Sequence, residues 1–317
     1  MDEKILTVIR ENGEKYVSGE EICKELGISR AAIWKHIEKL RHEGYDIAAT
    51  PHLGYRFISA PDRLIPLEVS WKLKTKIFGK KIYSFKETDS TNTIAYRLAE
   101  NGEKEGSVVF AEQQTKGRGR FHRAWASPQG GIYMSLILRP KLEPIQTALI
   151  TLTASVAVAE AIREVTNLPA RIKWPNDVLI NSSKISGILT EMKAEQDTID
   201  FMILGIGVNV NTSKQELPSR ATSIAAQLKT PISKVGLSKR ILELLEAYYL
   251  KLDEDFESII NKWRGLSGTL GNRVKIHAHN QTLEGQALDI DENGGLILRL
   301  DSGFTKHILS GDVELIR

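Results

Sequence analysis

Two helix starts separated by a short turn constrain the first part of the chain most strongly. Ser18 and Glu21 are spaced as a capping box, in which each side chain satisfies a backbone amide at the start of a helix. Gly27 can end that helix in a left-handed conformation, and Ser29 can cap the next helix. Two capped helices this close together are typical of a helix-turn-helix.

Elements on either side of this pair complete the predicted N-terminal domain, which we assign to residues 1–60. Apolar residues recur at helical spacing before and within it, at Ile5, Leu6, Ile9, Ile33, Ile37 and Leu40. Residues 45–58 contain two short strand-like runs flanking Pro51 and Gly54, which predicts a β wing. From the residues alone, this domain suits DNA binding or a helical protein-interaction module.

Pro61 and Pro66 mark a predicted domain boundary. Beyond it, the sequence predicts an α+β structure. We expect strands at 81–85, 108–113, 132–138, 171–174, 178–180, 185–192 and 201–210. Helical patterns cover 91–99, 146–165 and 237–253. This mixture predicts a central sheet with flanking helices over residues 61–267. Short alternating runs at 273–278, 283–290, 296–300 and 306–309 predict a small β-barrel over residues 268–317.

Composition excludes several classes of protein. The chain has 41% hydrophobic and 26% charged residues, which is ordinary for a soluble globular protein. It has no uninterrupted apolar run long enough for a membrane span, and its first residues lack the apolar core of a secretory signal. Cys23 is the only cysteine, so no internal disulfide can form and we expect a cytoplasmic protein. A net charge of +3 does not by itself indicate nucleic-acid binding.

The most informative motif is TKGRGR, which opens the segment Thr115–Trp125 that we call the strap. Gly117 and Gly119 allow the backbone to approach a ligand closely, while Arg118 and Arg120 supply fork-shaped charged donors. Backbone amides and guanidinium groups together favour a phosphate or carboxylate. A solvated basic loop, or an Arg–Gly segment that touches nucleic acid, is the alternative.

A second motif is KWPND, followed after Asp177 by Lys184 at the start of KISGIL. Asp177 and Lys184 are close enough in sequence to pair across a hairpin. The ammonium group can face a cleft, because apolar residues follow it. Packing of Trp174 and a lysine that merely reaches solvent are equally compatible with this spacing.

Two further motifs supply polar groups. GIGVNVN, at residues 205–211, is a poor dinucleotide fingerprint, because no third glycine and no helix start follow it. Its alternation fits a strand whose asparagines can point at a ligand. DSTN, at residues 89–92, lies at a helix start; N-capping explains one of its side chains, and three remain to bind a small polar ligand.

No nucleophile with a candidate base is evident, and the seven histidines lack metal-ligand spacing such as HExxH. Cys23 lies on the second helix of the N-terminal domain and suits a partly buried core position. We therefore expect neither a covalent enzyme intermediate nor a metal held by the protein itself.

Together these motifs resemble the bacterial family of bifunctional biotin protein ligases and biotin operon repressors. The resemblance extends over essentially the whole chain and rests on DSTN, Q-x-x-GRGR-x-x-R-x-W, KWPND, KISGIL and GIGVNVN in this order. It implies a winged helix-turn-helix, a central mixed sheet like that of class II synthetases and a C-terminal SH3-like barrel. One departure is His122, where the family often has a glycine two residues after GRGR.

The resemblance implies a role for each matched residue. Biotin would be bound by Ser90, Thr91, Asn92, Gln114, Arg118, Gly119, Arg120 and Lys184. The nucleotide would be surrounded by Arg123, Trp125, Asn176, Asp177 and Asn209. Catalysis would depend on Lys184, Arg120, Arg118 and Asp177. Operator DNA would be contacted by Ser29, Arg30, Ala31, Trp34 and Lys35 at the start of the third helix.

The implied activity is formation of biotinyl-5'-AMP from biotin and ATP, with Mg²⁺ on the phosphates, and transfer of biotin to a lysine. The acceptor would be the biotin carboxyl carrier protein of acetyl-CoA carboxylase or a similar enzyme. Biotinyl-5'-AMP would promote a homodimer that represses biotin genes. Residues 1–60 contain nine Lys and Arg against ten Asp and Glu, a net charge of −1, which favours a dimer over tight monomeric DNA binding. A regulator without catalysis and a lipoate-type ligase are the competing interpretations.

Overall fold

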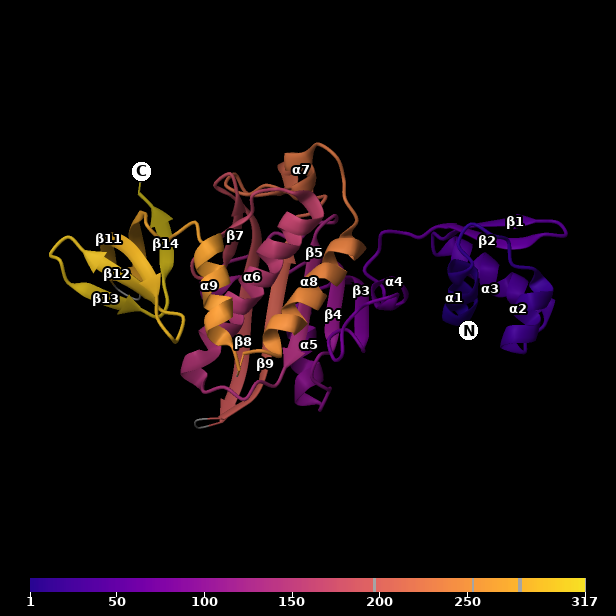
Figure 1. The fold of residues 1–317 in the computed structure, drawn as a ribbon, viewed down its shortest axis with the longest axis horizontal. Helices are drawn as coiled ribbons and strands as arrows, with labels where there is room; N and C mark the ends of the chain where they lie inside the picture. The colour runs from indigo at the N-terminus through magenta and orange to yellow at the C-terminus, as the bar shows by residue number, and fades with distance from the viewer. Residues whose placement is uncertain (196–197, 253, 279–280, 317) are drawn as a thin grey trace. The chain divides into compact units, whose positions relative to one another are not determined.

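The computed structural model describes residues 1–195, 198–252, 254–278 and 281–316. Contacts separate the chain between Arg63 and Leu64 into two compact units (Figure 1). Each unit is described by itself.

The first unit is a helix-turn-helix with a wing, as predicted. Its elements are α1 Asp2–Glu11, α2 Gly19–Leu26, α3 Arg30–His42, β1 Asp46–Thr50 and β2 Gly54–Ser59. Both halves of the capping box form at the start of α2, and Gly27 ends that helix at a φ of +66°. The Ser29 hydroxyl accepts a hydrogen bond from the Ala32 amide at the start of α3. The apolar side chains predicted for α1 and α3 form the buried core.

The second unit is built on a seven-stranded mixed sheet. Its strands are β3 Ile82–Thr88, β4 Val108–Gln114, β5 Ile132–Leu138, β6 Arg171–Lys173, β7 Asp177–Ile180, β8 Ser183–Glu195 and β9 Thr198–Val208. The order across the sheet is β3-β4-β5-β9-β8-β7-β6. Strands β3 and β4 are parallel, and the other neighbours are antiparallel.

Helices cover both faces of the sheet, which explains why the central strands are continuously apolar. Along one face lie α6 Thr147–Thr166, α8 Lys234–Tyr249 and α9 Phe256–Leu266 (Figure 1). Helix α5 Thr91–Glu100 packs on the opposite face, against side chains that alternate with those beneath α6. Two short helices complete this part of the chain, α4 Pro66–Ser70 and α7 Ile224–Leu228. The sequence patterns predicted neither α9 nor the two short helices.

The outer side of β8 is only partly paired. Strand β7 pairs with β8 as far as Gly187, whereas β9 pairs with it from Ser186 to Glu195. The Asn176 backbone and side chain then bond the amide and carbonyl groups of Ile188. Within the described chain, residues 189–195 therefore have no strand partner on that side. We call this stretch the free edge.

Strands near the C-terminus form a five-stranded antiparallel sheet in the order β13-β12-β11-β10-β14. They are β10 Arg273–Ala278, β11 Gln281–Ile290, β12 Leu296–Leu300, β13 Thr305–Ile308 and β14 Asp312–Leu315. Trp174 Nε1 donates to the carbonyl of Gly294, 3.0 Å away, which connects this sheet to the central one. The predicted fold class is confirmed, although sequence analysis missed β14.

The end of helix α8 and the burial of α6 bear on two predictions from the sequence. Helix α8 ends at Tyr249, before the predicted limit of 253, and residue 253 itself lies outside the described residues. Among the described helices, the segment Pro144–Thr166, which consists of the 3-10 turn Pro144–Gln146 and α6, is long and apolar enough to cross a membrane. However, 67% of its most apolar window is buried inside the protein. Such burial is typical of a core helix, because helices that are apolar all round lie in the interior of large domains.

Candidate functional site

A cavity of about 160 Å³ opens at the start of α5, between the strap and the strands β7, β8 and β9. It gathers most of the polar residues that the motifs predicted. Its lining includes Ser90, Thr91, Asn92, Gln114, Arg118, Gly119, Arg120, Arg123, Trp125, Asn176, Asp177 and Lys184. Of the residues that the family resemblance assigns to biotin or the nucleotide, Asn209 alone does not line the cavity.

The floor of the cavity is held by the first turn of α5. The backbone amide and the hydroxyl of Thr91 both donate to Gln114 Oε1, at 2.8 and 3.1 Å. Ser90 occupies the N-cap position, but its side chain makes no capping hydrogen bond, so the expectation of ordinary side-chain capping is wrong. The Asp89 carboxylate instead accepts from the Ser90 amide. Burial disfavours the charged form of Asp89, but bonds from Ser90 and Thr88 outweigh it and lower its pKa.

Asn92 is buried and bonded on both sides of its amide. Its Nδ2 donates to Glu191 Oε2 at 2.7 Å, and the hydroxyl of Ser135 donates to its Oδ1 at 2.6 Å. Gly205 passes so close that a Cβ there would lie 2.2 Å from Asn92 Oδ1. The motifs did not predict Glu191 or Ser135 as site residues. The alternation of β8 supplied a hint, because Gly187 and Leu189 line the cavity and Glu191 is next on the same face.

The strap folds back on itself beside this floor. The Trp125 amide donates to the carbonyl of Gly117 at 2.9 Å, and the Gly119 amide donates to that of Arg123 at 2.7 Å. A Cβ at Gly117 would lie 2.5 Å from both Ser127 Oγ and the Trp125 carbonyl, so the first glycine of the motif is required for this close approach.

The departure from the family pattern falls at a bend of the strap. Phe121 and His122 both adopt left-handed backbone conformations, with φ of +54° and +58°. A glycine would adopt this conformation without the steric cost that a side chain incurs. His122 therefore keeps a backbone path suited to glycine, and the strap accommodates the substitution.

Each arginine of the strap has a different partner. Arg118 Nη2 lies 3.0 Å from Glu191 Oε2. Arg120 Nη1 donates to Asn176 Oδ1 and to the carbonyl of Gly311, each at 3.2 Å. Arg123 pairs with Asp312 at the start of β14. Burial lowers the pKa of Arg120, and the carboxylates of Asp312 and Asp177 oppose that shift. The strap is thus tied both to β8 and to the C-terminal sheet.

Lys184 and Asp177 form the ion pair expected across the β7–β8 hairpin. Lys184 Nζ lies 2.6 Å from Asp177 Oδ1 and 5.1 Å from the centroid of the Trp125 ring. The lysine side chain is 33% exposed, so it faces the cavity and is not free in solvent. Trp174 of the same motif is a packing residue, 1% exposed, with both of its nitrogen donors bonded to the protein.

The Trp125 indole lies in a slot lined by two glycines. A Cβ at Gly207 would come within 2.6 Å of Trp125 Nε1, and one at Gly187 within 2.9 Å of its ring. Trp125 Nε1 is buried and lacks a hydrogen-bond partner among the described residues. Because buried donors are normally satisfied, this nitrogen is available to a ligand.

The asparagines of GIGVNVN have mainly structural contacts. Asn211 bonds the backbone of Ile232 through both ends of its amide, so the expectation that it points at a ligand is wrong. Asn209 is 1% exposed and donates to the carbonyl of Thr222. Its Oδ1 is buried without a partner among the described residues.

The residues predicted to contact DNA lie at the exposed start of α3. Trp34 is 57% exposed, and Arg30 lies 3.2 Å from Glu20 of α2. Exposed positions also include Ser29, Ala31 and Lys35. Large side chains exposed on a helix of this motif are placed to meet another molecule.

Family models match three parts of the chain. An HTH domain matches residues 2–56, the biotin/lipoate A/B protein ligase family matches 84–209, and a biotin protein ligase C-terminal domain matches 269–316.

Relatives extend the match to nearly full length. The bifunctional ligase/repressor BirA of Bacillus subtilis is 39% identical, over 98% of this chain and 97% of its own. BirA of Escherichia coli is 30% identical, over 98% and 96%. A solved biotin protein ligase from Aquifex aeolicus, in complex with biotin and ATP, is 32% identical with a TM-score of 0.65, over 75% of this chain and 99% of that one. The chain belongs to the BirA family of bifunctional biotin ligases and repressors.

Proposed function

We propose that this ligase and repressor forms biotinyl-5'-AMP in the cavity beneath the strap and transfers biotin to a lysine of a carrier protein. The observation that carries the proposal is that the strap arginines and the Lys184–Asp177 pair line one cavity. Two anions must meet in the first step, and these cations are positioned to reduce their repulsion.

Biotin would lie on the floor of the cavity. The hydroxyl and amide groups of Ser90, Thr91, Asn92 and Gln114 suit its polar ring system. Lys184 would meet its carboxylate, because the ammonium group faces the cavity and is already paired with a carboxylate.

ATP would lie toward the other end of the strap, near Arg123, Trp125 and Asn176. The unpartnered donor of Trp125 and acceptor of Asn209 support a polar ligand such as adenine in this region. Among the described residues, no group of three or more His, Cys, Asp or Glu is arranged to hold a metal ion. These residues therefore do not fit a resident metal, and Mg²⁺ would enter as part of the ATP substrate.

In the first step, a carboxylate oxygen of biotin forms a bond to the α-phosphorus, and the bond to the β-phosphate breaks to release pyrophosphate. Lys184, Arg118 and Arg120 would hold both anions in place, and positioning with electrostatics is most of what this chemistry requires. The resulting mixed anhydride is sensitive to water. The strap would cover it, since excluding water prevents such side reactions.

In the second step, a neutral lysine amine of the carrier attacks the biotinyl carbonyl, and the bond to AMP breaks. The amine proton must leave, and we assign Asp177 to orient the amine or accept the proton. The carrier would be the biotin carboxyl carrier protein of acetyl-CoA carboxylase or of a similar enzyme.

The decisive experiment incubates the protein with labelled biotin, ATP and a carrier domain. We expect biotin-dependent pyrophosphate release and a label on one carrier lysine, located by peptide mapping. Absence of pyrophosphate release would identify a sensor without catalysis. Preference for lipoate over biotin in the same assay would identify a lipoate ligase.

For the regulatory activity, we propose that biotinyl-5'-AMP promotes a homodimer whose two α3 helices bind operator DNA in the cytoplasm. The free edge of β8 supports this proposal, because an unpaired strand edge readily adds a strand from another chain. Carrier and second protomer would compete for this surface, which links repression to unmet demand for biotinylation.

We propose that three domains share these activities: residues 1–60 bind DNA, residues 61–267 carry out the reaction, and residues 268–317 form the C-terminal barrel.

A further inference from the structure

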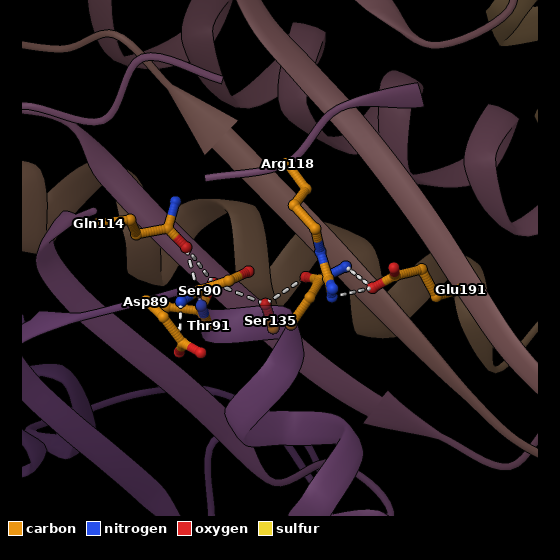
Figure 2. Close-up of polar contacts among 8 residues, drawn as sticks. Asp89, Ser90, Thr91, Gln114, Arg118, Ser135 and Glu191 are labelled. Carbon is orange, nitrogen blue, oxygen red and sulfur yellow. Dashed lines mark hydrogen bonds and ion pairs between the residues drawn. The ribbon is translucent and has the colours of Figure 1, made fainter. Parts of the chain in front are cut away.

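A chain of hydrogen bonds, closed into a ring by the backbone of the strap, joins the cavity floor to the strap and reaches β8 at Glu191. Figure 2 shows the part of it around Thr91, Ser135, Glu191 and Arg118. On one side, Glu191 Oε2 accepts from Asn92 Nδ2 at 2.7 Å, and Asn92 Oδ1 accepts from Ser135 at 2.6 Å. The Ser135 hydroxyl also lies 2.8 Å from Thr91 Oγ1. The floor residues are thus bonded to one another before any ligand is bound.

The ring continues from the floor to the far end of the strap. Thr91 donates to Gln114 Oε1, and Gln114 Nε2 donates to Ser127 Oγ at 2.8 Å. Ser127 in turn donates to the carbonyl of Trp125 at 3.1 Å. The strap itself completes the ring by returning from Trp125 to Arg118, whose guanidinium group lies 3.0 Å from Glu191.

Glu191 is distinctive because one oxygen serves both halves of the ring. Its Oε2 accepts from Asn92 of the floor and from Arg118 of the strap. Its side chain is 32% exposed and that of Arg118 is 43% exposed. Ion pairs with this much exposure contribute little to stability. The contact therefore matters for where the two side chains point.

We propose that Glu191 is a positioning residue, which aligns Asn92 for biotin and holds the strap closed through Arg118. The inference rests on the proposed function, in which Asn92 and Arg118 contact biotin and its adenylate. Holding binding groups in their bound geometry lowers the cost of binding, because less freedom is lost when the ligand arrives. Glu191 itself lies outside the residues that line the cavity.

The two contacts are separable by substitution. Glu191→Gln keeps an oxygen that can accept from Asn92, but removes the charge that attracts Arg118. We expect it to release biotinyl-5'-AMP about tenfold faster, with the KM for biotin unchanged. Glu191→Ala removes both contacts, so we expect faster release of the adenylate. We also expect the KM for biotin to rise about tenfold, because the fraction of the protein with Asn92 aligned for biotin would fall to about a tenth.

The test measures the KM for biotin, kcat for pyrophosphate release, and the rate at which labelled biotinyl-5'-AMP leaves the full-length protein. Glu292→Gln is the matched control, because it makes the same change at an exposed residue between β11 and β12, outside both the cavity lining and the free edge. Thermal midpoints are recorded for all variants. The isosteric Glu191→Gln variant keeps the test informative if Glu191→Ala does not fold.

Wild-type KM and release rates in both Glu191 variants would reject the positioning role, as would a lowered thermal midpoint with unchanged kinetics. Tighter retention of the adenylate in Glu191→Gln would also reject it, since Glu191 would then be competing with the ligand for Arg118. If the wild-type protein made no biotinyl-5'-AMP, the proposed function would fail as well. If the wild-type protein makes biotinyl-5'-AMP and the Glu191 variants behave as it does, only the role of Glu191 is rejected.

Discussion

Lys184 has two contacts that define its role at the scale of single residues. It is paired with Asp177 on β7 and lies over the face of the Trp125 ring. The strap and the β7–β8 hairpin therefore meet at one ammonium group. A ligand carboxylate that enters the cavity would meet an ammonium group that Asp177 already holds in place.

We expect Lys184→Ala to lower the rate of biotin-dependent pyrophosphate release by about 10²–10³-fold, because a well-aimed charged donor is lost. The fold should persist, since the lysine is partly exposed. Lys193→Ala is the control on the same strand, where the side chain lies 3.8 Å from Glu100 and away from the cavity. Near-wild-type release by Lys184→Ala would contradict the assignment.

Sequence motifs located most of the site residues but not their partners. Ser135 and Ser127 belong to no motif, and Glu191 lies two residues beyond the end of KISGIL. Their importance arises only when strands distant in sequence are brought together. Asn211 illustrates the opposite failure, because a polar residue in a promising motif is occupied by the backbone of Ile232.

At the scale of secondary-structure elements, strand β9 shapes the site because two of its residues are glycines, which have no side chain. Gly205 makes room for Asn92, and Gly207 makes room for the Trp125 indole. Strands with glycines in their interior often mark such close approaches. The sequence predicted a strand at this position whose glycines allow another group to come close. Only the structure shows that these groups are Asn92 and the Trp125 indole.

Gly207→Ala places a methyl group 2.6 Å from Trp125 Nε1 and must displace the indole. We expect the KM for ATP to rise about tenfold, equivalent to about 1.4 kcal/mol. Gly265→Ala in α9 is the control, because a Cβ there meets nothing within 4 Å. Steady-state kinetics at varied ATP decide the matter, and an unchanged KM would show that Trp125 does not serve the nucleotide.

Helices α1 and α3 are joined by Asp2, which lies 2.5 Å from His36 Nδ1 and 2.6 Å from Lys39 Nζ. Burial raises the pKa of Asp2, but bonds from Lys39 and His36 outweigh it and give a net lowering. A lowered pKa in the folded state means that the stabilisation is present above the ordinary value of 3.8 and is lost as pH falls below it.

We therefore expect Asp2→Asn to weaken the N-terminal unit by about 0.5 kcal/mol at neutral pH, the size typical of an exposed ion pair. The difference from wild type should vanish in acid, as the wild-type carboxylate becomes protonated. Amide hydrogen exchange in α1 and α3 measures it, with Glu3→Gln as control. A difference that grew as pH fell would contradict the sign.

At the scale of the whole molecule, the order of the strands brings the motifs of the site together. Alternating runs in the sequence predicted sheets and barrels, but no local pattern places β9 between β5 and β8. That order brings the GIGVNVN strand beside KISGIL and leaves β8 with its free edge. Helix α9 was missed although Ile259, Ile260, Trp263 and Leu266 recur at helical spacing.

Dimer affinity should rise about tenfold or more when biotinyl-5'-AMP is bound, a coupling of about 1.4 kcal/mol. Met192→Glu, which adds a charge on the free edge, should weaken the dimer, whereas Ile145→Glu at another exposed site should not. Analytical ultracentrifugation with and without the adenylate measures both effects. Equal affinities in the two conditions would remove adenylate-driven dimerisation.

Arg120 and Arg123 reach from the middle of the chain to Gly311 and Asp312. During synthesis on the ribosome, the strap therefore emerges long before two of the groups that hold it. A nascent polypeptide would carry the cavity residues before the strap has its contacts with the C-terminal sheet. Those contacts can form only after the segment around residue 311 has left the exit tunnel and folded.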